Sequence, residues 1–349
     1  MIDSINLIIY IKWLDFKLLE FFGIKVKRYI NNRSIIPNMK DILIVSEDEP
    51  NEIWTRNKDY GYSFSYKTVY FIFSVKNKYL LLITNAHKIL EKKEITLSDI
   101  TNYQNAVGRI LNDILPHRKY TLYLNRIDYH IDIQLKDEEE MKLYIDILNK
   151  HNKKFHYMKK RNNYLSSVYL TTKQGQFTLN IYNKEEEQMD KYGIKSEEYE
   201  NVLRLEIQNR PARIKAEAKR KSEPVEKKLE NYFSKEGMEK GFFELLSKYL
   251  YEGDYYTKRS AKQKINRNTT LKQSQKERIK NYIDAVASTT PREAYEKQKV
   301  CCEDTANRYI KILNKLGINP VTLENNCSYN RLENLVKRAR QIAENKYFK

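Results

Sequence analysis

The 349-residue sequence has little cysteine, little glycine and no long apolar run, and each shortage excludes a class of protein. Three cysteines, two of them adjacent at Cys301 and Cys302, cannot form a disulfide framework or a four-ligand zinc site. This cysteine usage is typical of a reducing cytosol. The nine glycines form neither G-x-x-x-x-G-K-[ST] nor G-x-G-x-x-G, so nucleotide-driven chemistry of the common kinds is not expected.

The longest apolar stretches are too short to cross a membrane, since no run reaches about 18 residues. The N-terminal stretch Ile5–Phe22 lacks a small-residue cleavage site, so it is not a signal peptide. Four charged residues interrupt it: Lys12, Asp15, Lys17 and Glu20. We therefore expect a cytoplasmic protein that does not act on membranes.

What the sequence does contain is positive charge and material for a core. Lys and Arg number 64 against 46 Asp and Glu, a net charge of +18, and hydrophobic residues make up 41% of the chain. That composition supports a packed fold and points to a polyanionic partner, most commonly nucleic acid. The richness in Lys, Asn, Ile and Tyr is typical of an AT-rich genome, but such a bias does not explain the excess of bases over acids.

The length suggests about two domains, or one large domain with an appendage. Residues 1–210 have the pattern of an α+β domain, with an antiparallel or mixed sheet and helices on one face. Helices are expected from an N-cap at Ser98 to Leu115, from a cap at Asp137 to Asn149, and from Glu185 onward. The predicted strands are Ile5–Ile11, Tyr62–Val75, Tyr79–Thr84, Tyr120–Gln134, Ser167–Thr171, Phe177–Asn183 and Val202–Asn209. A turn at Lys173-Gln174-Gly175 separates two of them.

Pro211 ends this pattern, and residues 211–285 form a basic helical region. Between Thr257 and Lys280 nine Lys or Arg residues accompany a single acid, Glu277. Such a cluster can follow DNA phosphates, although a run of charge is also typical of a solvated helix face. The residues that we expect to contact DNA here are Lys258, Arg259, Lys262, Lys264 and Arg267.

Residues 286–349 form a small helical module. Pro291 starts a short helix over Arg292–Lys299, the chain turns at Val300–Cys302, and a second helix follows over Glu303–Leu316 with Gly317 as its C-terminal cap. This is the shape of a helix-turn-helix, whose second helix would present polar residues to the major groove. Those residues are Asn307, Arg308, Lys311 and Asn314. A plain helical hairpin has the same spacing.

Three predicted strands alternate with period two and have one polar face each. In Arg126–Ile133 the even-numbered residues are polar, Tyr182 lies on the polar face of Phe177–Tyr182, and Leu203–Gln208 has polar even-numbered residues. If the strands share a sheet, one face presents Arg126, Asp128, His130, Asp132, Tyr182, Arg204, Glu206 and Gln208. The ordinary polar outer face of a half-covered sheet has the same pattern.

This face has a possible chemical use. Carboxylates and an imidazole suit Mg²⁺ or Mn²⁺, which can polarise a phosphodiester. A tyrosine becomes a nucleophile when a cation stabilises its phenolate, and Lys184 follows Tyr182 closely enough to do so. Glu187, three residues after Lys184 on a helix, could hold that lysine. Attack on DNA would leave a phosphotyrosine and a free 3′ hydroxyl without ATP.

Five short segments resemble rolling-circle replication initiators of the filamentous-phage gene II type, a family of phages and plasmids. The start Met1-Ile2-Asp3-Ser4-Ile5-Asn6-Leu7 is similar to theirs. Tyr182-Asn183-Lys184-Glu185-Glu186-Glu187 matches their Tyr-Asn-Lys-x-x-Glu segment, and Leu203-Arg204-Leu205-Glu206 matches the strand that follows. Thr305–Ile318 resembles their last helical segment. Arg126-x-Asp128-x-x-x-Asp132 looks like a strand of the related plasmid initiators and conjugative relaxases.

The resemblance implies an enzyme of the bacterial host cytoplasm that nicks one strand at a replication origin and later rejoins it. It implies Tyr182 as nucleophile, Lys184, Glu187 and Arg204 as supporting groups, and Mg²⁺ or Mn²⁺ as cofactor. The implied metal ligands are Asp128, His130, Asp132 and Glu206. The partners would be single- and double-stranded origin DNA, a host helicase and a host polymerase.

One departure affects the ligand set, because the better-known initiators have a His-x-His pair that this chain lacks. Tyr169 and Tyr192 are further candidate nucleophiles. Two alternatives stay open: a conjugative relaxase with the same chemistry, and a DNA-binding regulator without enzymatic activity.

Overall fold

A computed structural model describes residues 1–31, 43–44, 59–150, 167–171, 175–193, 195–222 and 224–348, with side chains for all of these except 28–31, 43–44, 59–60 and 192. The fold is α+β, as the sequence predicts. The chain forms two compact units, and each combines two separate segments. Unit 1 holds Met1–Tyr129 and Gln208–Gly237, and unit 2 holds His130–Ile207 and Met238–Phe348. The functional boundaries at residues 210 and 285 stay predictions.

Unit 1 is built on a sheet with the strand order β3-β2-β4-β5-β6-β1-β7. The neighbouring pairs in this order are antiparallel. The strands are β1 (Ile2–Tyr10), β2 (Lys27–Asn31), β3 (Leu43–Ile44), β4 (Asp59–Tyr66), β5 (Val69–Ser74), β6 (Tyr79–Asn85) and β7 (Tyr123–Gln134), whose last residues belong to unit 2.

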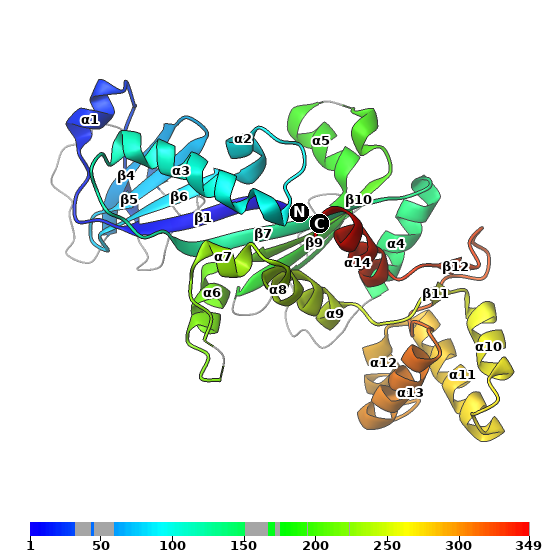
Figure 1. Ribbon diagram of the computed structural model, residues 1–349. Coiled ribbons are helices and arrows are strands. Elements are labelled where there is room, and N and C mark those ends of the chain that lie inside the picture. The colour runs from blue at the N-terminus through cyan, green and yellow to red at the C-terminus, as the bar shows by residue number, and fades with distance from the viewer. Residues whose placement is uncertain are drawn as a thin grey trace. The chain divides into compact units, whose positions relative to one another are not determined.

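Helices α2 (Ala86–Leu90) and α3 (Ile100–Ile114) cover one face of this sheet (Figure 1). The apolar side of α3 is buried, and its Tyr103 hydroxyl lies 2.5 Å from that of Thr84 on β6. Three short helices follow β10: α6 (Pro211–Ala218), α7 (Leu229–Tyr232) and α8 (Lys235–Met238). The Tyr129 hydroxyl donates to the Tyr232 carbonyl over 2.6 Å, which ties the 208–237 segment to β7.

Two sequence predictions in unit 1 are wrong. Tyr62–Val75 is not one strand, because the chain turns between β4 and β5 at Lys67, whose φ is +50°. Ser98 is not the N-cap of the long helix. A capping box joins Thr96 and Asp99 instead, in which the Thr96 amide donates to Asp99 Oδ2 over 2.9 Å and a short 3₁₀ turn leads into α3.

Unit 2 contains the sheet segment β7-β10-β9-β8, whose strands carry the predicted polar face. The bounds of β8 (Ser167–Thr171), β9 (Phe177–Asn183) and β10 (Val202–Asn209) are those predicted. In the predicted turn before β9, Gly175 has a φ of +61°, while Lys173 and Gln174 lie outside the described residues. Helix α5 (Lys184–Tyr192) follows β9 directly.

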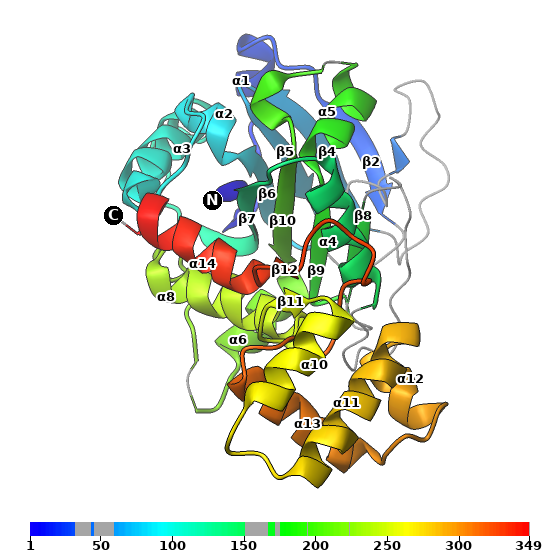
Figure 2. The same cartoon turned by 90° about the vertical axis from the view of Figure 1, so that its right-hand side faces the viewer.

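Helix α14 (Leu335–Lys346) lies beside α4 (Glu138–Lys150), as Figures 1 and 2 both show. The sequence analysis does not predict α14. Its Arg338 donates to Glu140 on α4 over 2.6 Å. Arg340 pairs with Glu239 in the π-helical turn Glu239–Phe243, which leads into α9 (Glu244–Tyr249). The predicted cap of α4 is confirmed, because Asp137 accepts from the Glu140 amide over 2.8 Å.

Four helices form a module within unit 2 (Figure 2). They are α10 (Lys258–Arg267), α11 (Gln273–Ser288), α12 (Pro291–Glu296) and α13 (Glu303–Lys315), and β11 (Tyr255–Tyr256) pairs with β12 (Arg331–Leu332) beside them. Pro291 starts its helix and Gly317 follows α13 with φ +65°, as predicted, although α12 ends at Glu296 and not at Lys299.

All three cysteines are free. In the part of the chain that the structure describes, no helix has both the length and the apolarity needed to span a membrane.

Candidate functional site

Tyr182 and Glu206 are the centre of a polar cluster on one face of β7, β10 and β9. Most odd-numbered residues in the middle of these strands are buried and apolar, including Ile131, Ile181 and Leu205, each with no exposed surface. On the other face the Tyr182 hydroxyl donates to Glu206 Oε2 over 3.0 Å. The two strands are neighbours in the sheet, so the predicted alternation brings the phenol and the carboxylate together.

Arg204 extends this polar cluster toward β7. Its Nε and Nη2 atoms each lie 2.6 Å from one carboxylate oxygen of Asp132, a two-pronged ion pair. Arg126 and Asp128 form a similar pair further along β7, with donor–acceptor distances of 2.8 and 2.6 Å, but both residues belong to unit 1. The predicted arginines therefore neutralise the predicted aspartates.

Lys184 and Glu187 complete the polar cluster from α5. Asn183 caps this helix by accepting from the Glu185 amide, so the helix begins two residues after Tyr182. The spacing of three places Lys184 Nζ 2.5 Å from Glu187 Oε2, and both side chains are buried. The predicted support of Lys184 by Glu187 is thus confirmed as a contact.

Burial and neighbouring charge shift the pKa values of three groups in the cluster. Burial, followed by the charge of Glu206, raises the pKa of Tyr182 well above its usual 10. Burial and the charge of Arg204 lower the pKa of Lys184. Burial opposes ionisation of Glu187, but hydrogen bonds from Lys184 and Lys191 outweigh it and lower its pKa to about 2. The phenol is therefore a protonated donor next to an acceptor carboxylate.

Three of the four residues predicted as metal ligands are engaged in other contacts. Among the described residues, no group of three or more His, Cys, Asp or Glu side chains is placed to hold one ion. The carboxylates of Asp128 and Asp132 are each held at both oxygens by an arginine. Glu206 accepts from Tyr182 and, over 3.4 Å, from Asn180. His130 is buried on β7. The requirement for Mg²⁺ or Mn²⁺ stays a prediction.

The sequence analysis does not include two residues of the polar cluster. Asn180 lies two residues before Tyr182, so the same alternation already placed it on the polar face. Lys191 lies four residues after Glu187, the helical spacing at which opposite charges meet, and it pairs with the second Glu187 oxygen. Of the alternative nucleophiles, Tyr169 lies on β8 opposite Asn180, and the side chain of Tyr192 lies outside the described residues.

The chain matches no protein-family model and no curated protein.

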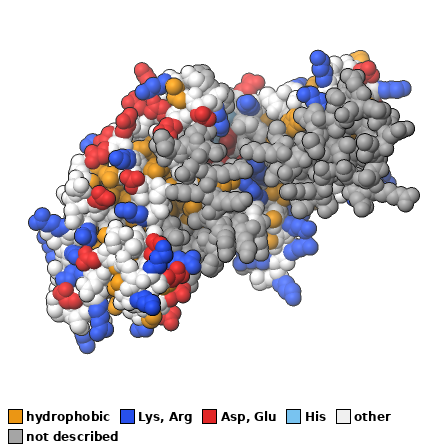
Figure 3. Space-filling view, turned by 180° about the vertical axis from the view of Figure 1, so that it is seen from behind, with side chains coloured by type: hydrophobic (Ala, Val, Ile, Leu, Met, Phe, Trp, Pro, Cys, Tyr) orange, Lys and Arg blue, Asp and Glu red, His pale blue; other side chains and the backbone are white. Residues whose placement is uncertain are grey.

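The predicted DNA-contacting residues lie on two helices of the module. Arg259 and Arg267 on α10 are exposed, whereas Lys262 pairs with Asp284 over 2.6 Å and Lys264 donates to the Tyr256 hydroxyl over 2.9 Å. The Nζ atom of Lys258 lies 3.8 Å from Oδ1 of Asp284. Lys and Arg side chains are interspersed with Asp and Glu at the lower left of Figure 3, where the module lies.

On α13 the buried residues are Ala306 and Leu313, and the opposite side is exposed at Asn307, Arg308 and Lys311. The exposed face of the predicted recognition helix is thus present. Asn314 is only half-exposed. Its amide nitrogen can reach the carbonyls of Ile310 and Glu252, so part of this side chain faces the protein. Whether this helix enters a DNA groove stays a prediction.

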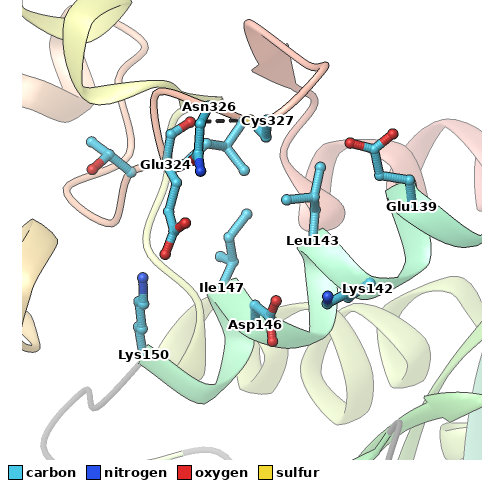
Figure 4. Close-up of a pocket in the computed structure, with 11 residues that line it drawn as sticks. Glu139, Lys142, Leu143, Asp146, Ile147, Lys150, Glu324, Asn326 and Cys327 are labelled. Atoms are coloured by element: carbon cyan, nitrogen blue, oxygen red, sulfur yellow. Dashed lines mark hydrogen bonds between the residues drawn. The ribbon is translucent and has the colours of Figure 1, made fainter.

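A separate pocket of about 240 Å³ lies between α4 and the segment before β12 (Figure 4). Its charged lining consists of three acids, Glu139, Asp146 and Glu324, and two lysines, Lys142 and Lys150. Apolar side chains such as Leu143 and Ile147 form the rest of the wall. An excess of acids does not suit a phosphate group, so this pocket is not a nucleic-acid site.

Proposed function

We propose that the protein is a DNA nicking and joining enzyme in which Tyr182 attacks a phosphodiester. The observation that carries the proposal is the hydrogen bond from the Tyr182 hydroxyl to Glu206. A phenol with a raised pKa is a poor nucleophile unless a base removes its proton as it attacks. Glu206 is positioned to be that base. The basic composition and the resemblance to rolling-circle initiators support DNA as the substrate.

In the proposed reaction the phenolic oxygen forms a bond to phosphorus, and its proton passes to Glu206. The bond to the 3′ oxygen breaks, and that oxygen takes a proton from water to become a 3′ hydroxyl. The 5′ phosphate stays on the tyrosine, and attack by a 3′ hydroxyl in the reverse direction reseals the strand. Arg204 acts electrostatically on both Tyr182 and Lys184, and we assign it the role of offsetting charge on the pentavalent phosphorus.

The test is nicking of a supercoiled plasmid that carries the origin, together with detection of a covalent protein–DNA species. The wild type should give both products, and Tyr182→Phe should give neither. Tyr169→Phe is the matched control because Tyr169 lies on the adjacent strand β8 and is also half-buried. Nicking that survives in Tyr182→Phe and is lost in Tyr169→Phe would move the nucleophile to Tyr169.

The metal requirement is tested in the same assay by comparing Mg²⁺, Mn²⁺ and a chelator. If activity depends on Mn²⁺ and persists fully in Asp128→Asn and Glu206→Gln, these two carboxylates are not ligands, and Glu206 is not the base either. A protein that binds origin DNA tightly but never nicks it, under any of these conditions, is instead a DNA-binding regulator. An initiator and a conjugative relaxase would behave alike here, since they share the chemistry.

A further inference from the structure

Exposed aromatic side chains gather at one end of unit 1, which we name the aromatic end. It contains Tyr10, Trp13, Phe16, Phe21, Phe22 and Tyr123, all with at least 37% of their surface exposed and Phe21 with 81%. Elsewhere among the described residues, only Met189 and Val300 are large exposed hydrophobic side chains. The rings lie on and around α1 (Phe16–Phe21), which Figure 1 shows beyond the C-terminal end of β1. An exposed concentration of this kind marks an interaction surface.

The rings are held in place by contacts with unit 1. Phe16 packs edge-on against Tyr62 of β4 with centroids 4.6 Å apart, and Phe22 contacts Tyr66 of the same strand at 5.6 Å. Tyr10 and Tyr123 meet at 5.8 Å at the ends of β1 and β7. These contacts order four of the six rings before any partner binds, which lowers the entropic cost of binding.

Trp13 has a cation stacked on its ring. The Arg118 guanidinium carbon lies 3.6 Å from the ring centroid, and Arg118 Nη1 donates to the Trp13 carbonyl over 3.0 Å. The guanidinium covers one side of the indole, and the residue remains 58% exposed. This exposure leaves ring surface on which a flat partner can stack while the guanidinium attracts negative charge.

Positive charge surrounds the rings. Exposed lysines lie within and beside the aromatic end at positions 12, 17, 25 and 119, whereas Glu20 is the exposed acid of the α1 segment. The nearby Asp15 is engaged as the N-cap of α1, where it accepts from the Leu18 amide. Interleaved aromatic rings and cations fit a chain of flat bases joined by phosphates better than a lipid surface, because no aliphatic side chain is among the large exposed residues here.

We infer that the aromatic end binds single-stranded DNA, with bases stacked on Trp13 and Phe21 and phosphates near Arg118 and Lys12. The choice of DNA rests on the proposed function, which would leave an unpaired strand after nicking. The stacking itself is independent of nicking and of the tyrosine in unit 2. Binding of this kind tolerates any base sequence and weakens with salt.

The experiment uses Trp13 as its own reporter. The chain has two tryptophans, so Trp54→Phe leaves Trp13 as the sole source of indole fluorescence. In a Trp54→Phe/Tyr182→Phe protein, which cannot cleave by the proposed route, titration with oligothymidine should quench this fluorescence to saturation. In the Tyr182→Phe background, Trp13→Ala and Phe21→Ala should each weaken oligothymidine binding about tenfold, as expected for loss of one stacked base.

Val300→Ala, an exposed apolar truncation in unit 2, is the matched control and should leave the affinity unchanged. Trp13→Phe keeps a ring and should restore most of the affinity lost in Trp13→Ala. The inference is wrong if oligothymidine leaves Trp13 fluorescence unchanged, or if anionic phospholipid vesicles, but not oligothymidine, shift its emission. Binding that depends on Trp13 while Tyr182-dependent nicking is absent would retain this surface and refute the proposed function alone.

Discussion

The Arg204 guanidinium on β10 donates to both carboxylate oxygens of Asp132 on β7, with each nitrogen–oxygen distance 2.6 Å. Arg204 is largely buried, and Asp132 is about one-third exposed. Loss of a partly buried charge partner leaves the remaining charge poorly solvated. The pair therefore joins two strands of the polar cluster as well as balancing its charge.

Replacing Arg204 should separate these two contributions. Arg204→Gln should lower the free energy of unfolding by about 2 kcal/mol, and Arg204→Lys by about half of that, because an ammonium cannot bind both oxygens. Urea unfolding measures both changes. A double-mutant cycle with Asp132→Asn is the control, and additive effects in that cycle would show that the pair does not stabilise the fold.

The ionisation of Glu187 should make stability depend on pH at acidic values. Its pKa falls from 4.5 to about 2 on folding, so the folded state favours the carboxylate. The stabilisation is therefore fully present above about pH 4.5 and is lost as the pH falls toward 2, with a maximum of about 3 kcal/mol. The difference in unfolding free energy between wild type and Glu187→Gln should shrink over this range. Glu138→Gln, at an exposed carboxylate, is the control. A difference that stays constant with pH would contradict the prediction.

Tyr182 should remain a neutral phenol well into the alkaline range. Burial and Glu206 raise its pKa well above 10, so a difference ultraviolet titration of wild type against Tyr182→Phe should show no tyrosinate from this residue near pH 10. For the same reason Glu206→Gln should lower nicking by about 10²-fold or more, since the phenol loses its proton acceptor. A tyrosinate signal that differs between the two proteins near pH 10 would remove the need for a base.

Gly253 should tolerate no side chain. It has φ +87°, and a Cβ at this position would lie 2.7 Å from the Asn319 backbone nitrogen and closer still to Ile318. Asn319 and Asn334 both donate to the Tyr251 and Gly253 carbonyls, so the segment cannot shift easily. Gly253→Ala should destabilise the protein by about 3 kcal/mol or more, measured by thermal unfolding.

Gly193 is the matched control for Gly253. It also has a positive φ, +66°, at the end of α5, but a Cβ there would have no atom within 4 Å. Gly193→Ala should cost about 1 kcal/mol from backbone strain alone. Equal losses for the two variants would show that the close approach of Ile318 and Asn319 does not constrain the chain.

The helices and strands could be predicted where the hydrophobic periodicity and the flanking turn residues gave the same boundaries. β8, β9 and β10 have the predicted bounds because strict alternation and flanking turns define them. Tyr62–Val75 is two strands because its apolar residues lie on both sides of a turn at Lys67 and Thr68, and neither turn residue is a glycine or proline that would mark it. No glycine or proline lies shortly before α14, so only its N-cap marks the beginning of this helix, where Asn334 accepts from the Val336 amide.

The polar cluster was predictable to the level of which residues share a face. Alternation placed Tyr182, Arg204 and Glu206 together, but it could not give their pairing, because that depends on strand order and register. The arginines bind Asp128 and Asp132, and period-two patterning cannot distinguish a metal ligand from half of an ion pair. The two-segment composition of each unit was also beyond local sequence signals, since it arises from contacts between distant parts of the chain.

The interleaving of the two units has a consequence for synthesis. Unit 1 needs Gln208–Gly237, so a growing chain cannot complete it until residue 237 has left the ribosome, with His130–Ile207 already made. Unit 2 in turn waits for the helices beyond Met238. The two units therefore cannot fold one after the other as independent domains from the N-terminus. During translation, strands whose neighbours have not yet been made have unpaired edges. Slowed translation between residues 130 and 237 should lengthen the time during which those edges can pair with other chains.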